Sequence, residues 1–320
     1  MTVESLSYHS MVSEHEGWLP VIARFDNSLH LAGSHGQVVT VTRVGCNGPL
    51  TVRVDHCGWT RLCNCKRLRV RTGTATSHHV FDPLLVSTSE LGKTAMRDPG
   101  KIGCHVSTAA PDPASFVTMS LVAGTIWQPR PAVIAWDAAR VRLTAAVLSC
   151  RTAESAFFHH DSMGETLATR RLETIRAMLV GPDHFRLAVQ RLAGLGPGLT
   201  PSGSDWLVGC ATALWHLSHR QPWEGTAASL LAVLTTRDEV LATTRLSQTL
   251  VSLAARGISA EDLIFLVESF SPRDIRRRAF EGFGIPILNR VLAWGHTSGA
   301  DVALGLADGA RVVLGLAGCG

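Results

Sequence analysis

The sequence predicts an α+β protein with a β-rich, barrel or sandwich-like N-terminal half and a helical C-terminal half. Two observations support this prediction. The hydrophobic period changes from two to about 3.6 between residues 151 and 162, and a glycine-rich loop that leads into an apolar helix occurs twice in the second half. We therefore place a β-rich domain at residues 1–155 and a helical domain at residues 156–320. With 46% hydrophobic and 18% charged residues, the chain can build a sizeable core.

The N-terminal half has a strand-like pattern from Trp18 to Arg151. It contains short β-branched runs separated by Gly, Asn, Asp or Pro, namely VIARF, LHLAG, QVVTVTRV, LTVRVDH and AVIAW. Residues 66–71, KRLRVR, also alternate, which predicts a strand with its arginines on one exposed face.

The C-terminal half has helical periodicity in the segments GETLATRRLETIRAMLVG and DHFRLAVQRLAG. Two more helices are expected at 227–236 and 238–256, the second ending at Gly257 as its C-cap. Ser259 begins a capping-box pattern, and Ser271, with proline at the first helical position, predicts a further helix start.

Charge and hydropathy exclude several classes of protein. The net charge of +4 is small for a nucleic-acid binder. The first eighteen residues lack the basic and apolar regions of a secretory signal. The apolar segment VALGLADGARVVLGLAG contains Asp308 and Arg311 and is short for a membrane span. We expect a cytoplasmic protein, with no membrane contact and with its eight cysteines mostly reduced.

The two glycine-rich segments are an internal repeat. GLTPSGSDWLVGCA starts at Gly198 and GHTSGADVALGLA starts at Gly295; with one gap at Pro201, both read Gly-x-Thr-Ser-Gly-x-Asp-x-x-x-Gly-x-Ala. The paired positions are Gly198/Gly295, Thr200/Thr297, Ser202/Ser298, Gly203/Gly299, Asp205/Asp301, Gly209/Gly305 and Ala211/Ala307.

This loop-plus-helix unit has the composition of an anion site. Glycine permits positive φ and close backbone approach, and free N–H groups at a helix start attract negative charge. Two such units together could hold a phosphate, a carboxylate or one of each. If Gly203 and Gly299 approach the ligand, valine at either position should abolish binding without unfolding the protein. The alternative is a pair of well-capped buried helices with tight turns, which Gly209 and Gly305 would allow to pack closely.

The first glycine-rich loop does not match the known glycine-rich motifs that bind nucleotides or carry a catalytic serine. Helical segments flank the loop on both sides, so it is not the strand-loop-helix of a dinucleotide fold. No Gly-Lys-Ser/Thr follows it, as a P-loop requires. A Gly-x-Ser-x-Gly nucleophile elbow is also lacking.

GLGPGLTPSGSDWLVG resembles the signature of an uncharacterised-domain family that includes the AllH-type subunit of anaerobic oxamate carbamoyltransferase. The GHTSGAD segment at Gly295 is similar to that family's second motif, as is the pattern of Thr243, Thr244 and Ser247. The resemblance covers the helical half. Ser204 stands where the family usually has the first of two aspartates, which argues against a paired-carboxylate metal site there. Asp205 can still orient a substrate amide or cap the helix.

The resemblance implies carbamoyl transfer between carbamoyl phosphate and a small amide such as oxamate. It also implies that the chain works beside partner subunits, and we expect neither a cofactor nor a metal. We expect catalytic roles for His296, Asp205 and Asp301. The expected substrate-binding residues are Gly196, Gly198, Thr200, Ser202, Gly203, Ser204, Thr243, Thr244, Arg245, Thr297, Ser298 and Gly299.

Two of these residues also have ordinary interpretations. His296 could donate to the carbamoyl oxygen or act as a general acid-base group, or it could cap a neighbouring carbonyl. Arg245 could bind a carboxylate or lie on the surface.

Three further clusters carry weaker hypotheses. His56, Cys57, Cys63 and Cys65, with His78 and His79 following, could hold zinc, although buried cysteines in strands or turns explain them as well. The group at 159–161, His-His-Asp, resembles a metal cluster only superficially. The arginine run at 276–278 is typical of a solvated helix face or a contact for a partner or anion.

The leading functional hypothesis is therefore an enzyme subunit of carbamoyltransferase type. Two rivals remain open: a non-catalytic sensor of a phosphorylated metabolite, and an ATP-dependent phosphotransferase. The sequence alone does not name the substrate, the partners or the oligomeric state. It also does not say whether the two loops face each other.

Overall fold

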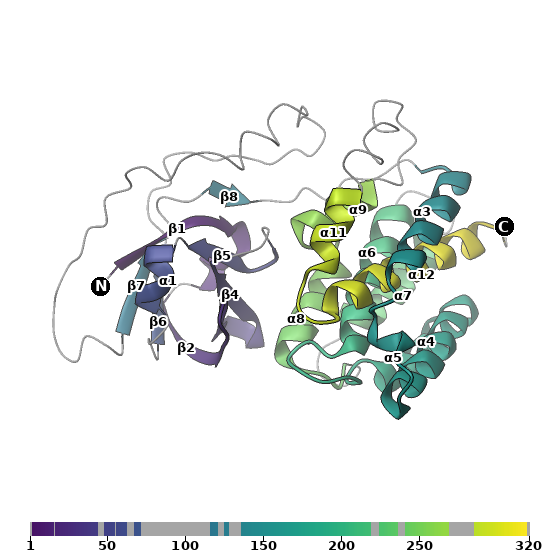
Figure 1. Ribbon diagram of the computed structural model, residues 1–320, viewed down its shortest axis with the longest axis horizontal. Coiled ribbons are helices and arrows are strands. Elements are labelled where there is room, and N and C mark those ends of the chain that lie inside the picture. Colours follow the sequence, from purple (N-terminus) through teal and green to yellow (C-terminus); the bar gives the residue numbers. More distant parts are fainter. Residues whose placement is uncertain are drawn as a thin grey trace. The chain divides into compact units, whose positions relative to one another are not determined.

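The computed structural model describes residues 2–15, 17–43, 48–54, 56–62, 67–71, 116–120, 125–127, 136–218, 224–235, 241–268 and 285–318. Contacts within the chain divide it into two compact units, residues 1–130 and 131–320. The first unit is built on a sheet and the second on helices (Figure 1). This arrangement confirms the α+β prediction.

The first unit is a curled sheet that returns on itself. Its strands lie in the order β5-β4-β3-β2-β6-β7-β1-β8, and β1 also pairs with β5, antiparallel. The pairs β2–β3, β3–β4 and β2–β6 are antiparallel, whereas β4–β5, β6–β7, β1–β7 and β1–β8 are parallel. The strands are β1 Thr2–His9, β2 Gly17–Arg24, β3 Ser28–Ala32, β4 Val38–Thr42, β5 Thr51–Val54, β6 Arg67–Arg71, β7 Phe116–Ser120 and β8 Thr125–Trp127.

Alternation of side chains explains why these segments are strands. In β6, Leu68 and Val70 are fully buried while Arg69 between them is exposed, as the sequence predicts. The inward residues of β3, β4 and β5 form one core with them. Short helical segments complete the unit: η1 Ser10–His15, η2 Ser34–Gly36 and α1 His56–Leu62.

The second unit contains the helices that position the site (Figure 1). They are α3 Ala138–Arg151, η3 Ala156–Phe158, α4 Ser162–Val180, α5 Pro182–Leu192, α6 Ser202–Ser218, α7 Glu224–Thr235, α8 Arg245–Ala254, α9 Glu261–Glu268, α11 Ile285–Leu292 and α12 Ser298–Gly318. The helix expected after Ser271 lies outside the described residues, as does the AVIAW segment except for Trp136.

One sequence-based expectation was wrong in this unit. The strand-like region was extended to Arg151, but residues 138–151 form α3. Val141, Ala145 and Leu148 are all buried. Their spacing of four and three residues gives a helical stripe that packs into the second core. The helix expected from residue 238 also begins later, at Arg245, because residues 241–244 are non-helical.

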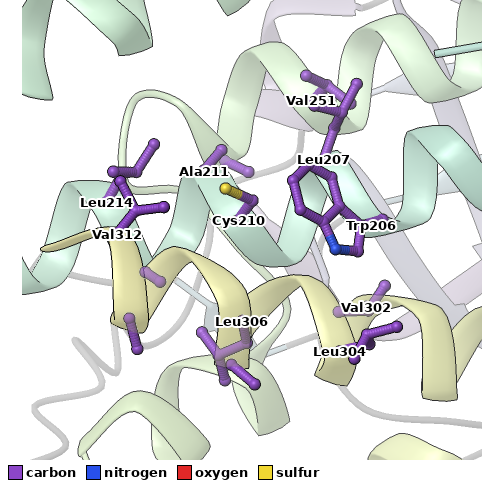
Figure 2. Packing of buried hydrophobic residues seen from close by; sticks show 14 of the residues in the cluster. Trp206, Leu207, Cys210, Ala211, Leu214, Val251, Val302, Leu304, Leu306 and Val312 are labelled. Carbon is purple, nitrogen blue, oxygen red and sulfur yellow. The ribbon is translucent and has the colours of Figure 1, made fainter. Parts of the chain in front are cut away.

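Helices α6 and α12 form the centre of the second unit and pack along each other (Figure 2). A methyl group at Gly209 would lie 1.9 Å from the carbonyl oxygen of Val302, and one at Gly305 would lie 2.0 Å from that of Trp206. Any side chain at these positions would therefore separate the helices. Close packing at Gly209 and Gly305 is confirmed.

A buried carboxylate joins α4 and α6 to α12. Asp308 is 2% exposed and accepts hydrogen bonds from Arg171, at 2.5 and 2.9 Å, and from Arg311, at 3.1 Å. The indole N–H of Trp206 donates to the same carboxylate at 2.9 Å. These donors compensate the loss of water around Asp308. Its charge therefore serves the packing of the helices.

Among the described helices, none is both long enough and apolar enough to cross a membrane.

Candidate functional site

The two glycine-rich loops adopt the backbone conformations that their glycines predict. The first loop connects α5 to α6, and Gly196 and Gly198 have φ values of +107° and +90°. The second connects α11 to α12, and Gly295 has φ +58°. Residues with a side chain rarely adopt these values. Each loop therefore turns sharply before the first turn of its helix.

Gly203 and Gly299 lie in that first turn, where each contacts the helix that precedes its loop. A methyl group at Gly203 would lie 1.9 Å from the carbonyl oxygen of Leu192, and one at Gly299 would lie 1.9 Å from that of Val291. The space beside both glycines is thus filled by protein backbone. Valine at either position would disturb the fold itself, so the expectation of lost binding without unfolding is wrong.

Several N–H groups at the two helix starts already have partners. Gly203 and Gly299 donate to the carbonyl oxygens of Leu195 and Trp294, each at 3.0 Å. Within α6, the N–H groups of Ser204 and Asp205 donate to Pro201 at 2.8 and 3.0 Å; in α12, Asp301 donates to Thr297 at 2.9 Å. These N–H groups therefore serve the fold.

The two loops face each other. The hydroxyls of Thr200, in the first loop, and Ser298, at the end of the second loop, are 3.2 Å apart. Hydroxyls of Ser298 and Thr200 also interact with Asp205. The corresponding residues of the other repeat, Ser202 and Thr297, interact with Asp301. The geometry brings together residues almost a hundred positions apart in the chain.

Asp205 and Asp301 are the charged centre of this site. They are only 4% and 0% exposed. Oδ1 of Asp301 accepts hydrogen bonds from the Ser155 hydroxyl at 2.6 Å and from the Ala156 N–H at 3.0 Å. The Oδ2 atoms of both aspartates are buried without a hydrogen-bond partner among the described residues. Because a buried acceptor without a donor is costly, each Oδ2 is a position where a ligand could donate.

Burial raises the pKa of both carboxyl groups. For Asp205 the increase is large: hydrogen bonds from Ser298 and Thr200 oppose it, and the nearby charge of Asp301 adds to it. For Asp301, hydrogen bonds from Ser155, Ser202, Thr297 and the Ala156 N–H oppose the effect of burial on the pKa. The pair therefore takes up a proton more readily than aspartates in water.

The raised pKa of Asp205 predicts how stability depends on pH. A carboxyl group whose pKa is higher in the folded state stabilises the fold below its ordinary value, about 4, and this contribution is lost as pH rises through the raised pKa. Asparagine removes the titration. The melting temperature of Asp205→Asn minus that of wild type should therefore increase as pH rises from about 4 to 7. Asp183→Asn, at an exposed position in the first turn of α5, is the matched control; a falling difference for Asp205→Asn would contradict the prediction.

Other residues expected to bind substrate hold the first loop in place. The Ser204 hydroxyl donates to the carbonyl oxygen of Ala193, and it lies 2.8 Å from the hydroxyl of Thr243. Thr244 and Ser247 both donate to the carbonyl of Leu199, and Thr244 also caps α8. Through these contacts, Thr243, Thr244 and Ser247 hold the first loop and the start of α6 in position.

The structure places the remaining candidates at the periphery. His296 is exposed beside the start of α12, and Arg245 is exposed as the first residue of α8. Ser155, which the sequence did not single out, is fully buried against Asp301. It is also the N-cap of η3, accepting from Phe157, and no motif in the sequence indicates its contact with a residue 146 positions away.

The described residues contain no group of three or more His, Cys, Asp or Glu side chains that could hold a metal ion. His56 is exposed at the start of α1, whereas Cys63, Cys65, His78 and His79 lie outside the described residues. His159 and His160 are exposed, and Asp161 caps α4 by accepting from the Gly164 N–H at 2.6 Å. The arginines at 276–278 also lie outside the described part.

The region that contains both loops matches a known family. Residues 192–310 match the family model described as oxamate carbamoyltransferase subunit AllH. This match confirms the resemblance seen in the two glycine-rich motifs. No solved structure shows a significant match to the chain.

Proposed function

We propose that this chain is a subunit of a carbamoyltransferase and binds a primary amide between its two loop-helix units, because residues 192–310 match the family model of the oxamate carbamoyltransferase subunit AllH. One observation supports the location of the site. Two buried aspartates from the repeated loop-helix units each have an oxygen that accepts no hydrogen bond from the part of the chain that the structure describes. An amide –NH₂ group supplies N–H donors for such oxygens.

The expected reaction needs an acceptor for a proton. In carbamoyl transfer to oxamate, the amide nitrogen forms a bond to the carbamoyl carbon, and the bond from that carbon to the phosphate oxygen breaks. Phosphate leaves with the bonding electron pair, and the amide nitrogen loses one proton. A carboxylate whose pKa is raised by burial is suited to accept that proton, and it can later release it to the departing phosphate.

The hydroxyl groups around the aspartates orient the two carboxylates. Thr200, Ser202, Thr297 and Ser298 come from both loops and hydrogen-bond to the pair. Each hydroxyl has one proton, which it donates to a carboxylate, and its oxygen can still accept a hydrogen bond. We therefore assign the –NH₂ side of the amide to the aspartates, with the hydroxyl oxygens as further acceptors. We assign no direct role in this binding to the exposed His296.

The proposal extends to the partners of the chain. The matched family is named as a subunit, so we expect complete turnover to require partner subunits, with weak or no turnover by the chain alone. Binding of the amide, in contrast, should need only this chain, because both aspartates and all four hydroxyls belong to it.

Ligand titration of the full chain tests this proposal. Oxamate and carbamoyl phosphate should each raise the melting temperature, because a ligand that binds only the folded state stabilises it; the stabilisation is about 2.7 kcal/mol at one hundred times Kd. Inorganic phosphate, which has no amide, should give a smaller increase. A shift with phosphate equal to that with carbamoyl phosphate would instead favour an anion sensor. A shift with Mg²⁺-ATP alone would favour a phosphotransferase.

A further inference from the structure

The contacts between the two loop-helix units are reciprocal. Gly209 of α6 packs on the carbonyl of Val302, and Gly305 of α12 packs on that of Trp206. In the repeat, Gly209 corresponds to Gly305, and Trp206 corresponds to Val302 because each directly follows its aspartate. Exchanging the two units therefore exchanges the two contacts, as in a two-fold symmetric interface.

The same exchange relates the surroundings of the two aspartates. Asp205 interacts with Thr200 of its own loop and Ser298 of the other loop. Asp301 interacts with Thr297 of its own loop and with the other loop's serine, Ser202. The site thus consists of two half-sites with the same chemical groups: one aspartate, one threonine and one serine.

The two reactants of the proposed reaction share one chemical group. A carbamoyl donor and oxamate both contain a planar H₂N–C(=O)– group that is attached to an anionic group. In each half-site the Oδ2 atom of the carboxylate and the two hydroxyl oxygens can accept hydrogen bonds from the –NH₂ side of that group. Two similar half-sites therefore fit two similar reactants.

Two hydrogen bonds break the symmetry. The segment before α4 donates to Asp301 through the Ser155 hydroxyl at 2.6 Å and the Ala156 N–H at 3.0 Å, and among the described residues Asp205 has no counterpart of these two donors. Additional donors hold a carboxylate in its ionised form and fix its orientation. Asp301 is thus suited to bind an –NH₂ group that keeps its protons. Asp205 lacks these two donors and is better suited to accept a proton.

From this asymmetry we infer that the two half-sites hold different reactants. The Asp205 half-site binds the acceptor amide, whose nitrogen must lose a proton, and the Asp301 half-site binds the –NH₂ group of the carbamoyl donor. Ser155 is a positioning residue for the donor half-site. This inference rests on the proposed function.

Calorimetric titration of the full chain with each reactant separately tests the assignment. Asp205→Asn should weaken oxamate binding about tenfold or more and change carbamoyl phosphate binding by less than about threefold, because a charged acceptor is lost in one half-site. Asp301→Asn should instead weaken carbamoyl phosphate binding about tenfold or more and change oxamate binding by less than about threefold. Asp183→Asn, in the exposed first turn of α5, should leave both affinities unchanged.

Threonine variants give a second, milder comparison. Thr200→Val should weaken oxamate binding more than carbamoyl phosphate binding, and Thr297→Val should do the reverse. Ser155→Ala should also weaken carbamoyl phosphate binding more than oxamate binding, but by less than Asp301→Asn does. The assignment is overturned if every variant weakens the binding of both reactants equally, or if the Asp205 variant mainly weakens carbamoyl phosphate binding and the Asp301 variant mainly weakens oxamate binding. In either case the proposed function stands. If the wild-type chain binds neither reactant, the proposed function itself fails.

Discussion

Alanine at Gly305 is expected to lower the stability of the helical unit by about 3 kcal/mol or more. The new methyl group would lie 2.0 Å from the carbonyl oxygen of Trp206, where a carbon atom cannot remain. Relief requires α6 and α12 to move apart. Because Gly209 packs on Val302 in the same interface, that movement would loosen the reciprocal contact as well. Thermal unfolding should detect a decrease in melting temperature of about 6–12 °C.

Gly225 provides the matched control for this substitution. It lies in α7, and a methyl group there would meet no atom within 4 Å. Alanine is a better helix former than glycine by about 1 kcal/mol, so Gly225→Ala should maintain or raise the melting temperature. If the two variants unfolded at the same temperature, close contact between α6 and α12 would not be the reason for glycine at 305.

The largest functional effect is expected at Asp205. In the enzyme assembled with its partner subunits, Asp205→Asn should lower the rate of carbamoyl transfer by about 10²- to 10⁴-fold, the range that a general base contributes. Asparagine keeps the shape of the side chain but cannot accept the proton from the attacking amide. Steady-state turnover at saturating concentrations of both reactants measures this effect on kcat.

Asp301→Asn supplies the comparison for that experiment. Because Asp301 is assigned to binding and not to proton transfer, its variant should retain a higher kcat than Asp205→Asn at saturation. The exposed Asp183→Asn should turn over like wild type. Near-normal kcat in Asp205→Asn would refute its role as the base and leave the buried pair with a structural function.

The sequence predicted the local features of the site correctly because they depend on neighbouring residues. The glycine-rich composition of both loops allowed positive φ, and the structure has it at Gly196, Gly198 and Gly295. The repeated Asp-x-x-x-Gly-x-Ala portion of the motif predicted the close helix packing seen at Gly209 and Gly305. The same motifs carried the family resemblance, which the match over residues 192–310 confirms.

The strand prediction for residues 138–151 was wrong although a helical pattern is present there. Val141, Ala145 and Leu148 have the spacing of a helical stripe, and all three are buried in the second core. The assignment of Gly203 and Gly299 to a ligand has a different cause. Glycine marks a close approach, but the sequence does not say whether a ligand or the carbonyl of a preceding helix makes that approach.

The amino-acid sequence is sufficient to identify the repeat, the sharp turns of the two loops and the residue types of the site, because each of these features depends on residues that are neighbours in the chain. Tertiary structure alone decided that Thr200 meets Ser298, that Asp205 and Asp301 are buried together, and that Ser155 holds only one of them. These contacts join segments far apart in the chain. They exist because the packing of α6 on α12 brings the two helix starts together, and no local pattern encodes which distant segments will pack.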